Sequence, residues 1–233
     1  MGFSDVAMNF LGHYYLDRNH PSSLFALGAA TPDLLSIYNE NFRVKHAHVR
    51  PGVSLDIDWD HLPLLEGMRR HFHADNLFHS SDFFNENTAF ATQELKRRFK
   101  TNEFQRKFFI SHVLLELLLD KALIDREKDI LHEYYTHFAV HWPFSSVKEA
   151  TEKVSRHSLP NYDHFLDKFL SNKYLTHYKE WDHIIFVLGR IMRRAGVDHP
   201  EFLDDPAMTT YLADLQEKIT PQIPKLFEDL RKG

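Results

Sequence analysis

Two stretches of the chain place imidazole and carboxylate side chains at successive helical turns. The two triplets are His71, Asp75 and His79, and His112, Glu116 and Asp120. Residues four apart are neighbours on the surface of an α-helix, with Cβ atoms about 5–6 Å apart. Each triplet therefore forms a stripe of possible ligands for a metal ion.

The first triplet is too long to bind a single ion. Three residues at this spacing span about 12 Å of helix axis. Two ions about 3.5–4 Å apart, with Asp75 as a possible bridge, suit that length better. The alternative is an exposed stripe without metal, because the chain is rich in histidine, with 17 among 233 residues.

The second triplet belongs to a run that is otherwise almost wholly apolar. Carboxylates are rarely buried unless they are paired or bind a metal. Since apolar residues occupy nearly every face of this helix, we expect Glu116 to point into the interior beside His112. The alternative is a buried ion pair between Glu116 and an arginine. Asp120, next to Lys121 near the helix end, is predicted to form a solvated ion pair.

Two residues upstream extend the set of candidate ligands. They are His13, within Gly12-His13-Tyr14, and Asp33, which follows a proline. The alternatives are a core histidine and a helix cap, a common role for aspartate. His46 and His48 lie in a polar segment and could reach over the site, although solvent-exposed loop histidines are the favoured interpretation. Metal clusters in helical bundles take ligands from several helices, so we predict one distributed cluster.

Composition limits the chemistry and the location of the protein. The chain has no cysteine, so any metal must be held by histidine, carboxylate and water, which suits Zn, Mn, Fe or Mg. The net charge of −5 argues against a general nucleic-acid binder. No apolar run reaches the roughly 18 residues of a membrane span, and the N-terminus does not resemble a signal peptide. We expect a cytoplasmic protein with no membrane span.

The elements that must position these residues are predicted to be helices. Apolar residues recur at helical spacing, and the period-two alternation of strands is nearly absent. Besides a short helix at about 6–18, the predicted helices span about 61–79, 82–98, 103–124, 126–141, 143–155, 161–170, 174–194 and 207–230. Pro221 and Pro224 should kink or break the last one. Residues 38–60 are predicted to be a loop or insertion over the site. The predicted fold is all-α, a single domain over residues 1–233.

Four short features of the chain carry a resemblance to a known family. They are Met8–His13, Ala29–Asp33, the helix with His71 and Asp75, and the run Tyr178–Ile184 with Val187 and Leu188. In this order they resemble the acyl carrier protein phosphodiesterase family. That family is similar to the HD-type helical metal-dependent phosphohydrolases, so the resemblance implies an HD-like bundle. It begins at Met8, which makes residues 1–7 a predicted N-terminal extension.

The resemblance implies a metal site and a reaction. Asp33, His71, Asp75 and the acid-bearing helix at 112–116 match the family's metal-binding pattern, with manganese as the usual ion. The implied reaction releases phosphopantetheine from a serine of acyl carrier protein. Two features depart from the family: His112 and Glu116 stand where two aspartates are expected, and residues 38–60 look like an insertion.

The added histidines make the pattern similar to the zinc-dependent phospholipases C as well. Those helical enzymes use a Pro-Asp segment, a His-x-x-x-Asp helix and a His-x-x-x-Glu helix around zinc. Both resemblances imply phosphodiester hydrolysis by a metal-activated water.

We therefore predict a metal-dependent phosphodiesterase that acts on acyl carrier protein or on a small phosphodiester. The predicted ions are Mn or Zn, and Fe is compatible. The predicted metal ligands are His13, Asp33, His71, Asp75, His79, His112 and Glu116. The predicted catalytic acids are Asp33, Asp75 and Asp182, and Arg69, Arg70 or Arg194 could contact the phosphate. Two alternatives are a non-catalytic helical binding protein and an HD-like di-iron oxygenase.

Overall fold

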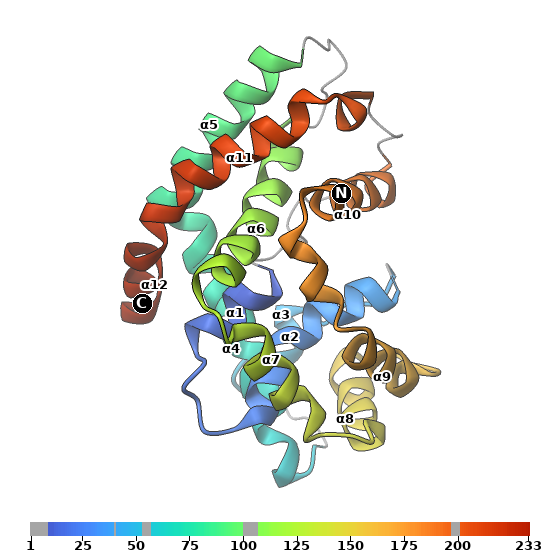
Figure 1. Ribbon diagram of the computed structural model, residues 1–233. Helices are drawn as coiled ribbons and strands as arrows, with labels where there is room; N and C mark the ends of the chain where they lie inside the picture. The colour runs from blue at the N-terminus through green and yellow to red at the C-terminus, as the bar shows by residue number, and fades with distance from the viewer. Residues whose placement is uncertain (1–8, 40, 53–56, 100–106, 197–200) are drawn as a thin grey trace. The chain divides into compact units, whose positions relative to one another are not determined.

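All regular elements in the described part of the chain are helices (Figure 1). The computed structural model describes residues 9–39, 41–52, 57–99, 107–196 and 201–233. The prediction of an all-α protein is therefore confirmed. The predicted extension at residues 1–7 lies outside the described residues.

Most of the α-helices within these ranges correspond to predicted spans, whereas the two α-helices between residues 23 and 49 were not predicted. They are α1 (Phe10–Leu16), α2 (Ser23–Tyr38), α3 (His46–Val49), α4 (Leu62–Ser80), α5 (Asp82–Arg98), α6 (Lys107–Arg126), α7 (Ile130–Ala139), α8 (Ser145–Ser155), α9 (Tyr162–Asn172), α10 (Trp181–Arg194), α11 (Ala207–Ile219) and α12 (Ile223–Lys232). Four short 3-10 helices are η1 (Trp59–His61), η2 (Tyr174–Lys179), η3 (Glu201–Asp204) and η4 (Thr220–Gln222).

Three predictions about helix ends have clear outcomes. Pro221 and Pro224 do interrupt the last predicted helix, because η4 separates α11 from α12. The single helix predicted at about 174–194 is wrong: η2 ends at Lys179, and Glu180 has an extended backbone before α10 begins. The predicted loop at 38–60 contains the short helices α3 and η1, while residues 40 and 53–56 lie outside the described residues.

The chain divides into two compact units. Unit 1 comprises Met1–Gly12, Asn76–Lys128 and His177–Gly233, of which residues 1–8 are not described, and unit 2 comprises His13–Asp75 and Asp129–Thr176. No helix in the described residues is long and apolar enough to cross a membrane.

Unit 1 is built around α6. Helices α5, α10 and α11 pack on it, and α5, α6 and α11 lie side by side (Figure 1). Every residue of α6 from Ile110 to Ile124 is buried, which explains why this helix is apolar on nearly all faces. Lys121 is buried within it and donates to the Lys179 carbonyl at 3.0 Å. Its ammonium also lies 4.6 Å from the centre of the Trp181 ring, which joins α6 to α10.

Unit 2 depends on a very close crossing of α2 and α4. A Cβ added at Gly28 would lie 2.1 Å from the Leu64 carbonyl oxygen, and one at Gly67 would lie 2.1 Å from the Phe25 carbonyl oxygen. Any side chain at either position would collide with backbone, so only glycine allows this approach. The crossing brings the backbone of α2 next to the ligand-bearing face of α4.

Candidate metal centres

The structure brings three predicted ligands of unit 2 together, which we call the His13 group: His13, His71 and Asp75. His13 Nε2 lies 3.2 Å from Asp75 Oδ1, and His71 Nε2 lies 3.3 Å from Asp75 Oδ2. The two imidazole rings stack, with centroids 4.0 Å apart. His13 and His71 are almost fully buried, and the Asp75 side chain is 15% exposed.

The orientation of His71 is set by the backbone of α2. Its Nδ1 lies 2.8 Å from the Ala29 carbonyl oxygen. A carbonyl only accepts hydrogen bonds, so Nδ1 carries the proton. The Gly28–Gly67 crossing places Ala29 within reach of the ring. A hydrogen bond from the second ring nitrogen to a backbone carbonyl is the usual support of a metal-ligating histidine.

With this tautomer, the His13 group offers a position for a proton or a metal ion between His71 and Asp75. In the neutral ring of His71, the Nε2 lone pair faces the carboxylate of Asp75. Two acceptors cannot form a hydrogen bond with each other, so a proton or a metal ion must lie between them for the contact to be favourable. A divalent ion held there would be a suitable partner for both side chains.

Unit 1 contains a second set of converging ligands, which we call the His112 group: His79, His112 and Glu116. His112 Nε2 lies 2.7 Å from Glu116 Oε1 and 3.0 Å from His79 Nε2. His79 Nε2 is 3.4 Å from the same carboxylate oxygen. Glu116 is buried beside His112, as predicted.

These distances suit a metal ion. Ligand atoms about 2.0–2.1 Å from a tetrahedral zinc ion lie about 3.3 Å from one another. The three separations of the His112 group, 2.7, 3.0 and 3.4 Å, are close to that value. Both groups present two imidazoles and one carboxylate, a donor set that suits zinc or iron better than magnesium.

Aromatic rings surround the imidazoles of the His112 group. The Phe84 ring makes edge contacts with His79 and His112, each with centroids 4.8 Å apart. Phe84 is buried, whereas the His79 side chain is 28% exposed. Solvent therefore reaches this group along the side of His79.

Asp33, predicted as both ligand and catalytic acid, is not a member of either group. It lies in the interior of α2, directly after Pro32, and its backbone carbonyl accepts the hydroxyl proton of Ser36. The alternative interpretation of Asp33 as a helix cap is wrong, because α2 begins ten residues earlier at Ser23 and is capped by Ser22, whose hydroxyl accepts from the Phe25 amide.

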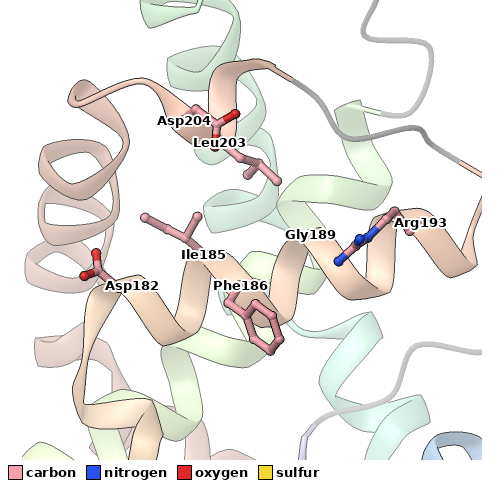
Figure 2. A pocket seen from close by; sticks show the side chains of 7 residues that line it. All are labelled: Asp182, Ile185, Phe186, Gly189, Arg193, Leu203 and Asp204. Carbon is pink, nitrogen blue, oxygen red and sulfur yellow. The ribbon is translucent and has the colours of Figure 1, made fainter.

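Asp182, the third predicted catalytic acid, also belongs to neither group. It is exposed on the first turn of α10 and lines a pocket of about 300 Å³. Figure 2 shows this pocket, with Phe186, Gly189 and Arg193 following along α10 and Leu203 and Asp204 contributed by η3. A catalytic role for Asp33 or Asp182 stays a prediction.

The prediction of a solvated ion pair for Asp120 is wrong. Its side chain is fully buried and accepts a hydrogen bond of 2.9 Å from the Gly12 amide, at the start of α1. Burial raises its pKa to about 7, although hydrogen bonds from the backbone of Leu11 and Gly12 act in the opposite direction. Lys121 pairs instead with Asp125, at 3.0 Å.

Other candidates have partners of their own. Arg70 pairs with Asp17 at 2.8 Å, and Arg69 donates to the Val49 carbonyl. The ring of His46 contacts Phe72, with centroids 5.7 Å apart. For His48, burial and nearby Arg156 lower the pKa. Neither histidine is a member of a ligand group.

Sequence reasoning missed the residues that support the ligands. They include Gly28, Gly67 and Ala29 in unit 2 and Phe84 in unit 1. A glycine inside a helical pattern indicates close packing, but the sequence does not identify the helix that packs against it.

Comparison of the chain with protein-family models, with curated proteins and with solved structures found no match.

Proposed function

We propose that this protein binds divalent metal ions in the His13 group and in the His112 group and hydrolyses a phosphodiester. The observation that carries the proposal is the convergence of two imidazoles and one carboxylate in each unit, at mutual distances that suit a metal ion. Bound ions would lower the pKa of a coordinated water towards about 7 and draw charge from the phosphoryl oxygens. The resemblance of four short sequence features to the acyl carrier protein phosphodiesterase family supports the same chemistry.

The charge of each group favours a phosphodiester. Two neutral imidazoles and one carboxylate around a divalent ion leave a net charge of +1. A phosphodiester carries one negative charge, so each loaded group would attract it. Asp75 and Glu116 thus stabilise the ion without cancelling the attraction for the substrate.

The residues have distinct roles in this proposal. His71 holds its Nε2 lone pair in place through the hydrogen bond from Nδ1 to Ala29. Asp75 spans His13 and His71 with its two oxygens. In the other unit Glu116 holds His112, and the partly exposed His79 faces solvent.

The substrate class follows from the resemblance. The phosphopantetheine linkage of acyl carrier protein is the first candidate, and a small phosphodiester is the second. Zinc and manganese are the first ions to test, with zinc favoured by the two imidazoles of each group.

The experiment compares matched histidine and glutamate variants with the unmodified protein. In His71→Ala and in Glu116→Ala we expect loss of one bound ion per chain and loss of hydrolysis of bis-p-nitrophenyl phosphate and of holo acyl carrier protein. His164→Ala is the control, because His164 is an exposed histidine on α9 outside both groups. Full activity and full metal content in both variants would overturn the proposal.

A second candidate function is oxygen activation by iron. Two histidines and one carboxylate are also the donor set of non-haem iron oxygenases, and each group has that composition. Two Fe per chain after purification, with oxygen consumption and no phosphodiester hydrolysis, would favour this candidate. A chain that retains no metal and has neither activity would be a helical binding protein.

A further inference from the structure

Phe108 is an exposed aromatic side chain next to the His112 group. It is 59% exposed, although the residues that follow on α6, from Ile110 onwards, are buried. Single exposed apolar residues are common on protein surfaces. Phe108 differs from such residues because its ring contacts the ring of His112, a candidate metal ligand.

Phe108 continues the stripe of ligands along α6. Phe108, His112 and Glu116 stand four residues apart, so they share one face of the helix. The rings of Phe108 and His112 have centroids 6.2 Å apart and meet edge to face at 77°. The phenyl ring therefore lies about one helical turn, or about 6 Å of axis, before the ligand histidine.

A buried ring supports Phe108 from α5. The rings of Phe84 and Phe108 make an edge contact, with centroids 6.5 Å apart. Phe84 itself contacts both histidines of the group. The two phenylalanines thus form an aromatic wall beside the ligand atoms, and the exposed surface of Phe108 is the part of that wall that solvent reaches.

We propose that Phe108 is a specificity-determining residue that contacts an aromatic or apolar substituent next to the bound phosphate group. This inference rests on the proposed function, because it assumes that the His112 group binds a phosphoryl oxygen through its ion. A phosphate bound there would carry its substituent past the exposed ring of Phe108. The preferred substrate class is then a phosphoester with a flat or apolar group on one side.

The test measures binding of two phosphonates that differ only in this substituent. Isothermal titration calorimetry of the zinc-loaded protein would compare phenylphosphonate with methylphosphonate. An aromatic contact contributes about 0.5–1.5 kcal/mol, so we expect phenylphosphonate to bind up to about tenfold more tightly. In Phe108→Ala the two affinities should become equal, with methylphosphonate binding unchanged.

Two matched variants control for a general effect of removing a ring. Phe108→Tyr keeps the aromatic face and should keep the preference. Phe186→Ala removes a ring that is 50% exposed on α10 and contacts His183 and Arg190, so it should behave as the unmodified protein. An unchanged preference in Phe108→Ala would overturn the inference. So would a change of oligomeric state in Phe108→Ala as its only effect, or no binding of either phosphonate by the unmodified zinc-loaded protein.

The outcome separates this inference from the proposed function. A protein that prefers phenylphosphonate through Phe108 but hydrolyses no phosphodiester would retain the inference and lose the proposed activity. A protein that hydrolyses phosphodiesters without any such preference would lose the inference alone.

Discussion

The two candidate metal centres share a donor set but differ in enclosure. The His13 group has two nearly inaccessible histidines with stacked rings, and the His71 tautomer is set by a backbone carbonyl. The His112 group has a partly exposed histidine and a wall of aromatic side chains. We infer that the first is suited to hold an ion firmly and the second to exchange ligands with solvent and substrate.

The two groups also depend on different parts of the sequence. The His13 group needs a backbone crossing that only glycine allows, so it depends on the main chain of α2 and α4. The His112 group depends on side chains of α4 and α5 and on the buried helix α6. Their responses to substitution should differ accordingly.

Removal of one carboxylate should have the largest effect and should act on one group. Loss of an outer-shell partner typically weakens metal binding 10–100-fold, so loss of a direct ligand should cost more than about 100-fold. We expect Asp75→Ala to weaken ion binding at the His13 group and Glu116→Ala at the His112 group, each leaving the other site intact. Competition titrations with a metal indicator would measure both dissociation constants. Equal weakening of both sites by one substitution would contradict the distinction between the groups.

A methyl group at the glycine crossing should destabilise unit 2. In Gly67→Ala the new Cβ would meet three backbone atoms, the Phe25 carbonyl oxygen, the Ala29 nitrogen and the Gly28 Cα, at 2.1, 2.7 and 2.9 Å. Overpacking typically costs about 1–3 kcal/mol. Because backbone atoms cannot rotate away as a side chain can, we expect the free energy of unfolding, measured with urea, to fall by about 3 kcal/mol or more. Gly189→Ala is the control, because its Cβ meets only the Leu203 side chain, at 3.2 Å. Gly189→Ala should lower the free energy of unfolding by less than about 1 kcal/mol. Equal losses in the two variants would contradict the claim that the α2–α4 crossing requires glycine.

The buried carboxylate of Asp120 should affect stability rather than metal binding. Its pKa in the folded protein is raised to about 7, above about 3.9 in the unfolded chain. The folded state therefore holds the proton more tightly, and the free energy of unfolding falls as the pH rises from about 4 to about 7. Asp120→Asn keeps an acceptor for the Gly12 amide and carries no charge.

At pH 8 we expect the free energy of unfolding of Asp120→Asn to exceed that of the unmodified protein by about 2–4 kcal/mol. This difference should shrink to nearly zero at pH 4. Denaturant unfolding of both proteins across this pH range would measure it. A difference that does not change with pH would show that Asp120 does not titrate there. Metal content should be the same in both proteins.

The smallest effect is expected in the rates of metal release. Since His79 is partly exposed whereas His13 and His71 are buried, a chelator should remove the ion of the His112 group faster than the ion of the His13 group. Stopped-flow mixing of zinc-loaded protein with a chromogenic chelator should give two phases. Asp75→Ala should retain only the fast phase and Glu116→Ala only the slow one. Retention of the slow phase by Asp75→Ala would reverse the assignment.

The helices and most of the ligands could be predicted from the sequence because both follow from local spacing. Apolar residues at helical intervals placed α4 and α5 to within one residue and α6 to within about four, and the four-residue spacing identified His71 with Asp75 and His112 with Glu116. The partners across helices could not be predicted in this way. His79 shares a helix with His71 and Asp75 but converges with His112 and Glu116, because that depends on how α4, α5 and α6 pack.

Asp120 shows why adjacency in sequence is a poor guide to pairing. Neighbouring residues on a helix point in directions about 100° apart, so Asp120 and Lys121 have different surroundings. Asp120 reaches the Gly12 amide, and Lys121 reaches Asp125 and the Lys179 carbonyl. The distant backbone partners of these side chains have no local signal in the sequence.

The most direct test of the two centres is anomalous diffraction from crystals of the zinc-loaded protein at the zinc absorption edge. We predict two peaks per chain: one bound by His13, His71 and Asp75, and one bound by His79, His112 and Glu116. At the first, the ion should contact His71 through Nε2, because Nδ1 is engaged with Ala29. The absence of a peak at either group, or a zinc ion bound to His71 through Nδ1, would contradict the account.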